Sequence, residues 1–156
     1  MKAVLLDEKR FTADLERPTP EKITDYVTYE ETPQDNKVII ERCKDADIMI
    51  VGSLRIEREV VEALPNLKLI QLTSVGSNHI DKEACEDNGV KLLNAPDFAT
   101  VTVAEHTMML MLSAMRAQIN YHNKVKDGEW KEKGRADIIK AEVIDIENLT
   151  LGLIGV

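Results

Sequence analysis

The chain has 156 residues, 44% of them apolar, which is typical of one globular domain or of one domain plus part of another. The formal net charge of -8 argues against a nucleic acid or an anionic membrane surface as partner, because both bind basic faces. No apolar run approaches the ~20 residues of a membrane span, and the spacing of Cys43 and Cys85 is not that of a metal or redox site. We therefore expect a soluble, cytoplasmic protein with reduced thiols.

Short apolar runs alternate with helical patterns along the first two thirds of the chain. The runs predict strands at Ala3–Leu6, Thr24–Tyr29, Asp47–Val51, Leu67–Leu72 and Val90–Leu93. Helices are predicted to begin at Pro33, to run from Arg55 to Leu64, and to run from Asp81 to about Asn88. The alternation predicts an α/β fold, a flavodoxin-like doubly wound parallel sheet of about five strands, with Thr24–Tyr29 at its edge.

Residues at the ends of these helices carry local signals. Thr32 precedes Pro33 and is a candidate N-cap, and Asp81 could cap the third helix. Gly89 stands where that helix should end, a position at which glycine is favoured. These residues predict where each helix begins or ends.

Two other functions of such a sheet are disfavoured by the strand ends. A receiver domain would need a further acid after the third strand, where this chain has Gly52 and Ser53. A flavin-binding flavodoxin would need a hydroxyl-rich phosphate loop after the first strand, where this chain has DEKRFTAD. We therefore expect a different ligand at the carboxyl ends of the strands.

The last third of the chain begins with a helix predicted from Val101 to about Lys126. Its central part is apolar nearly all round, which is typical of a helix covered on most sides. Four methionines lie in it and are expected to serve packing or an interface: Met108, Met109, Met111 and Met115. Residues 127–150 are predicted to be a linker, and Leu151–Val156 a further strand.

Three motifs carry a resemblance to a known family. They are the SVGSNHID run of Ser74–Asp81, the NAP of Asn94–Pro96, and the VAEHT of Val103–Thr107 heading the apolar helix. With these motifs the chain resembles, in register from Met1 to Val156, the D-isomer-specific 2-hydroxyacid dehydrogenases, which include phosphoglycerate, glycerate and D-lactate dehydrogenases. The final TLGLIGV resembles the strand that enters the family's dinucleotide-binding glycine loop, so we expect the sequence to be truncated inside that motif.

The resemblance implies a division of the chain. Residues 1–100 would be the substrate-binding domain and 101–126 an interdomain helix that also forms a homodimer. Residues 127–150 would link it to 151–156, the first strand of a truncated Rossmann domain for NAD or NADP. Such a chain would bind the cofactor weakly, because the glycine motif needs GxGxxG between strand and helix.

The resemblance also implies site residues. The substrate carboxylate would bind backbone N–H groups of Val75, Gly76 and Ser77, where glycine permits close approach. The alternative is that Gly76 only satisfies a turn that needs positive φ. Thr107 and Gly155 would lie near the cofactor, the alternative for Thr107 being an ordinary hydroxyl bonded to its own helix.

The family's catalytic arginine, glutamate and histidine are expected beyond residue 156. None of the three histidines, His79, His106 and His122, therefore takes the catalytic role, and no metal site is expected from their spacing. The leading interpretation is the N-terminal part of an NAD(P)-dependent D-2-hydroxyacid dehydrogenase acting on a small 2-keto or 2-hydroxy acid, inactive as an isolated chain. The alternative is a non-catalytic flavodoxin-like module that dimerises or binds a small acid.

Overall fold

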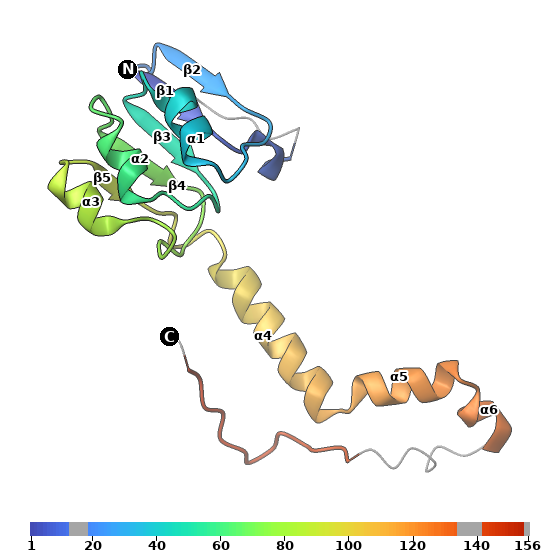
Figure 1. Cartoon of the computed structure of the whole chain (residues 1–156). Helices are drawn as coiled ribbons and strands as arrows, with labels where there is room; N and C mark the ends of the chain where they lie inside the picture. Colours follow the sequence, from blue (N-terminus) through green and yellow to red (C-terminus); the bar gives the residue numbers. More distant parts are fainter. Residues whose placement is uncertain (13–18, 134–141, 155–156) are drawn as a thin grey trace. The chain divides into compact units, whose positions relative to one another are not determined.

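A computed structural model describes residues 1–12, 19–133 and 142–154. It divides into two compact units, Met1–Ala99 and Thr100–Val156. In the first unit, five parallel strands form one sheet in the order β2-β1-β3-β4-β5 (Figure 1). The strands are β1 Lys2–Leu5, β2 Asp25–Thr28, β3 Ile48–Val51, β4 Leu69–Leu72 and β5 Lys91–Leu93. This is the flavodoxin-like strand order, so the predicted five-stranded parallel sheet is confirmed.

The central strands are apolar because both neighbours and a helical layer enclose them. Val4, Met49 and Ile70 are fully buried, and they lie at paired positions of β1, β3 and β4. The outer strand β2 instead carries exposed residues, as its alternating pattern predicted. Buried apolar runs therefore mark the middle of the sheet and alternation marks its edge.

Three helices connect the later strands: α1 Asn36–Cys43, α2 Arg58–Glu62 and α3 Lys82–Asp87. Each crossover proceeds in the same direction along the sheet, and parallel crossovers are right-handed, so the three helices cover one face. Figure 1 shows them as a row in the first unit. Their inward side chains, including Ile39, Val60 and Ala84, complete the core with β1, β3 and β4.

The helix ends differ in part from the predictions. The N-cap of α1 is Asp35, whose carboxylate accepts a hydrogen bond of 2.8 Å from the N–H of Lys37, so the prediction for Thr32 is wrong. Thr32 is buried instead, and its hydroxyl donates to the carbonyl of Leu6. The Asp81 cap is confirmed by a 2.8 Å bond from the N–H of Ala84.

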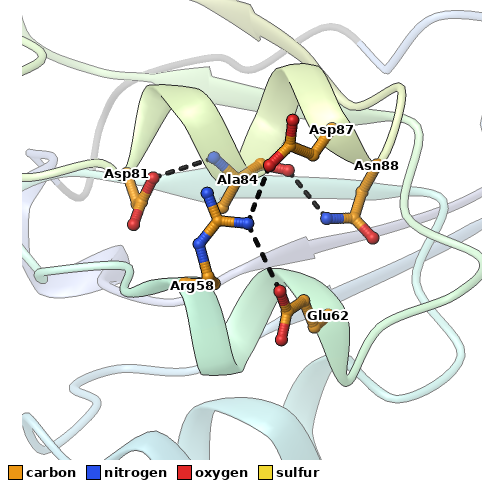
Figure 2. A network of polar contacts seen from close by, with 6 residues as sticks. All are labelled: Arg58, Glu62, Asp81, Ala84, Asp87 and Asn88. Atoms are coloured by element: carbon orange, nitrogen blue, oxygen red, sulfur yellow. Dashed lines mark hydrogen bonds and ion pairs between the residues drawn. The ribbon is translucent and has the colours of Figure 1, made fainter.

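Helices α2 and α3 are joined by a polar network on their surface (Figure 2). The guanidinium of Arg58 donates to Asp87 at 2.8 Å and to Glu62 at 3.4 Å. Asn88 ends α3 by donating to the carbonyl of Ala84 at 2.8 Å. The network joins α3 to α2. Because α3 follows the loop after β4, the same contacts also hold the end of that loop.

The second unit contains α4 Thr100–Met115, α5 Gln118–Lys126 and α6 Glu129–Lys133. The prediction of one helix over 101–126 is wrong, because Ala117 has φ 50 and leaves the right-handed region. The carbonyl of Met115 then accepts a 2.8 Å hydrogen bond from the N–H of Ile144. A contact from another segment thus satisfies a carbonyl at the end of α4.

Two further expectations for this unit change. The predicted linker contains the helix α6, while residues 134–141 lie outside the described part of the chain. The predicted strand at 151–156 is not formed at residues 151–154, and residues 155–156 are not described. A strand needs a neighbour for its backbone groups, and none of the described residues pairs with this segment.

Helix α4 is apolar but has no buried residue. Val101 is 69% exposed and Leu110 is 55% exposed, and methionines lie between them. The expectation of a helix covered on most sides therefore does not hold within the described residues. In the ranges that the structure describes, no helix combines the length and the apolarity needed to cross a bilayer.

Candidate functional site

The candidate site is the loop of residues 73–79, between β4 and α3. It begins at the carboxyl end of β4, the side of an open parallel sheet where ligands bind. The N–H of Thr73 donates to the carbonyl of Val51 at 3.0 Å, which ties the start of the loop to β3. Its far end is held by Ile56, which exchanges hydrogen bonds of 2.9 Å with His79 and Asp81. The loop is therefore anchored at its start to β3 and at its far end to the segment that follows β3.

The carbonyl groups and the N–H groups of Val75, Gly76 and Ser77 differ in their hydrogen bonding. All three carbonyls accept hydrogen bonds: that of Val75 from the Asn94 side chain at 2.8 Å, that of Gly76 from the Ser74 hydroxyl at 3.1 Å, and that of Ser77 from the N–H of Ile80 at 3.1 Å. The three N–H groups donate to no acceptor among the described residues. The loop thus has three consecutive donors that no described residue occupies and that a ligand or water could accept from.

Gly76 lies in the middle of these three residues, beside open space. A Cβ built on Gly76 would have no heavy atom within 4 Å, so open space lies beside the backbone. Among the described glycines, positive φ occurs at Gly89 and Gly128 and not at Gly76. The alternative that Gly76 merely serves a turn of positive φ is therefore wrong. Gly76 therefore has ordinary backbone geometry and borders open space.

Two residues that support the loop belong to the motifs of the sequence, which assigned them no role of their own. Ser74 and Asn94 bond the loop carbonyls, and the N–H of Ala95 donates to the carbonyl of Ser74 at 3.1 Å. The signal for Asn94 was its place directly after β5, the neighbour of β4 in the sheet. Polar residues that follow adjacent parallel strands lie at the same edge, so the pairing of β4 with β5 brings Asn94 to the loop.

The two predicted cofactor contacts lie in the second unit. The hydroxyl of Thr107 donates to the carbonyl of Val103, four residues earlier in α4, at 2.7 Å. Gly155 lies outside the described residues, and 151–154 form no regular structure. None of the described residues supplies a phosphate-binding glycine loop, so this part of the chain does not by itself fit a bound dinucleotide. A cofactor role for Thr107 and Gly155 remains a prediction.

Other ionisable groups form no reactive cluster in the described ranges. The Nε2 of His79 is buried without a hydrogen-bond partner among the described residues, while His106 and His122 are exposed in the second unit. No set of histidine, cysteine and carboxylate side chains in the described ranges could hold a metal ion. Burial raises the pKa of the Cys43 thiol to about 12, which keeps it protonated and unreactive.

Residues 4–149 match the family described as "D-isomer specific 2-hydroxyacid dehydrogenase, catalytic domain". The chain belongs to this family. It is 32% identical over 133 residues to a glycerate dehydrogenase of Methylorubrum extorquens, a match that covers 84% of this chain and 41% of that protein. A D-3-phosphoglycerate dehydrogenase of Methanocaldococcus jannaschii is 38% identical over 118 residues, which are 75% of this chain and 21% of the relative. The chain thus spans less than half of either dehydrogenase.

Solved structures of the family share the fold. An NAD-dependent formate dehydrogenase from Staphylococcus aureus, solved with NAD, aligns with a TM-score of 0.63 and 25% identity over 86% of this chain and 44% of that chain. A glyoxylate/hydroxypyruvate reductase from Sinorhizobium meliloti, solved with NADP and malonate, aligns with a TM-score of 0.70 and 19% identity, covering 99% of this chain and 46% of that chain. Family members thus bind either dinucleotide.

Proposed function

We propose that this chain is the substrate-binding part of an NAD(P)-dependent D-2-hydroxyacid dehydrogenase, which interconverts 2-keto and 2-hydroxy acids. The proposal rests on the N–H groups of Val75, Gly76 and Ser77, which donate to no described residue, while the carbonyls of the same three residues all accept hydrogen bonds. On a chain of this family, such a row of donors suits the carboxylate of a small acid. Its donors are neutral and need no change of protonation.

The role of the loop is to bind and orient the acid. Charge-assisted hydrogen bonds from the amides hold the carboxylate, and the open side of Gly76 lets it approach the backbone. The hydrogen bonds at Thr73 and Ile56 hold the two ends of the loop, so that the loop loses little conformational freedom when the acid binds. NAD or NADP, when bound to the complete enzyme, would supply the hydride chemistry, and the part proposed for the loop is to hold the carboxylate of the acid.

The proton donor and the orienting arginine are assigned to residues beyond 156, as the family resemblance implies. We accordingly expect the isolated chain to show little or no turnover and weak cofactor affinity. Incubation with NADH and glyoxylate, hydroxypyruvate or pyruvate measures this directly. Turnover well above background would contradict the expectation.

We further assign the protein to the cytoplasm and propose that α4 forms a homodimer contact. Apolar side chains of α4 from Val101 to Leu112 are exposed, and contiguous exposed apolar surface marks sites of association. The same surface favours the second candidate, a non-catalytic module that dimerises or binds a small acid. Sedimentation velocity at micromolar concentration should reveal a dimer, and a monomer would refute the contact. Inactivity of the complete protein toward every 2-hydroxy acid tested would favour the module.

Acid binding is best tested by titration of the 15N-labelled chain with D-lactate. We expect saturable shifts of the Val75, Gly76 and Ser77 amide signals with a dissociation constant in the millimolar range, about -4 kcal/mol. D-lactamide, which lacks the negative charge, is the matched control and should cause no such shifts. Equal responses to the two compounds, or shifts confined to other residues, would refute the assignment of the loop.

A further inference from the structure

A pair of residues with a characteristic reactivity, Asn88 and Gly89, lies at the end of α3. It is the one Asn-Gly pair in the sequence, and both residues are exposed to solvent. The side-chain amide of an asparagine is attacked most easily by the next main-chain nitrogen when glycine follows, because glycine has no side chain to hinder the approach. A Cβ built on Gly89 would have no heavy atom within 4 Å, so open space borders this residue.

The chemistry available to this pair is deamidation. The main-chain nitrogen of Gly89 attacks Cγ of Asn88, the new N–Cγ bond closes a five-membered succinimide, and the Cγ–Nδ2 bond breaks. The leaving nitrogen takes up the proton that the Gly89 nitrogen loses and departs as ammonia. Water then opens the ring. Cleavage of the N–Cγ bond gives aspartate, whereas cleavage of the bond to the main-chain carbonyl carbon gives isoaspartate, and neither product requires an oxidant or a reductant.

In the folded chain, hydrogen bonds hold both reacting groups. The Nδ2 of Asn88 donates to the carbonyl of Ala84 at 2.8 Å, a contact drawn in Figure 2. The N–H of Gly89 donates to the carbonyl of Glu86 at 3.2 Å. The attacking nitrogen and the amide that it must reach are therefore each bonded to a different carbonyl of α3.

Two further contacts keep this turn closed. The N–H of Val90 donates to the carbonyl of Cys85 at 2.8 Å, and both side chains are buried in the core, so the turn is a Schellman motif. Beside it, Arg58 of α2 donates to the carboxylate of Asp87, the last residue of α3, at 2.8 Å (Figure 2). Attack by Gly89 requires the turn to open first, so its rate should follow the fraction of molecules in which the turn is open.

We propose that Asn88 is a site of spontaneous deamidation, which the closed turn at the end of α3 slows and which loosens that turn once it has occurred. Aspartate has no N–H to donate, so its carboxylate would face the carbonyl of Ala84 with acceptor against acceptor. It would also add a negative charge next to Asp87 at the C-terminal end of a helix, where the helix dipole disfavours it. The inference is independent of the proposed function.

The first experiment measures the rate of conversion. The full chain is incubated at mildly alkaline pH with and without concentrated urea, and mass spectrometry follows the tryptic peptide of residues 83–91, in which Asn88 is the one asparagine. Conversion should be at least about tenfold slower in the folded chain, which corresponds to an opening free energy of about 1.4 kcal/mol. Absence of conversion in urea would overturn the site, and equal rates in the two conditions would overturn the protection by the fold.

Two variants test whether α2 helps to hold the turn. Arg58→Gln removes the contact with Asp87 and should speed conversion of the folded chain about twofold to fivefold, the range expected for one exposed ion pair, without changing the rate in urea. Lys44→Gln is the matched control, because it removes an equal charge from a pair with Glu41 at the end of α1. It should leave both rates unchanged. An unaltered rate in Arg58→Gln would overturn the part assigned to α2.

Hydrogen exchange tests the effect of the modification on the turn. Asn88→Asp carries the charge of the aspartate product, and Asn88→Ala removes the same hydrogen bond without adding charge. The amide protons of Gly89 and Val90 should exchange at least about threefold faster in Asn88→Asp than in the unmodified chain, with Asn88→Ala between the two. Unchanged exchange in Asn88→Asp would overturn the loosening of the turn.

Discussion

Replacing Gly76 with alanine should separate ligand binding from stability. An added Cβ would meet no atom within 4 Å, and Gly76 is not among the described residues with positive φ. Under these conditions Gly→Ala stabilises a protein by about 0.4–1 kcal/mol, because the unfolded chain loses freedom. The methyl group would occupy the open side of the loop, so we expect at least a tenfold loss of D-lactate affinity, about 1.4 kcal/mol.

Gly89 provides the matched control. Its Cβ would also meet no atom within 4 Å, but its φ is +66. Gly89→Ala should therefore destabilise the chain by about 1–2 kcal/mol, the cost of the left-handed conformation, and leave D-lactate binding unchanged. Urea unfolding gives both free energies and amide-shift titration gives both affinities. If Gly76→Ala lost as much stability as Gly89→Ala, or bound D-lactate normally, the reasoning about the loop would be refuted.

Three further predictions concern the first unit. The hydrogen bonds from the Lys68 side chain and from the N–H of Lys2 lower the pKa of Asp47 in the folded chain. The stability that the Asp47 carboxylate adds should therefore be complete above about pH 4 and be lost as the pH falls through the folded pKa. The difference in urea midpoint between the unmodified chain and Asp47→Asn should shrink over that acidic range. Cys43, with its pKa near 12 and a buried side chain, should resist a disulfide reagent at pH 8 until urea unfolds the chain; rapid native labelling would contradict this. Ile39 is fully buried, so Ile39→Val should cost about 0.5–1.5 and Ile39→Ala about 2–5 kcal/mol in urea unfolding; equal costs would argue against tight packing.

The sequence was most informative where burial decides structure. The apolar runs of β1 and β3 could be recognised because a strand enclosed on both faces needs apolar residues throughout. The strand order followed from the alternation of strands with helices. The cap at Asp81 was also predictable, since its carboxylate bonds an amide only three residues away. Local and strongly periodic features were thus visible in the sequence.

Features that depend on distant segments were less accessible. Thr32 has the sequence position of an N-cap, but its hydroxyl donates a hydrogen bond to the carbonyl of Leu6. Asp35 caps α1 instead. The break between α4 and α5 occurs at Ala117, where the sequence has no glycine or proline that would predict it. The hydrogen bond from Asn94 to the carbonyl of Val75 and the close approach of Arg10 to Gly52 both join residues that follow different strands, so they depend on the assembled sheet.

In the proposed function the acid is held in the loop by main-chain N–H groups, which every amino acid except proline possesses. Substitutions of Val75 or Ser77 would then leave these donors in place. Differences in which acid is bound would depend on side chains at the adjoining strand ends. One fold could in this way bind the carboxylate that its substrates share through the same N–H groups, while other residues determine which substrate is bound.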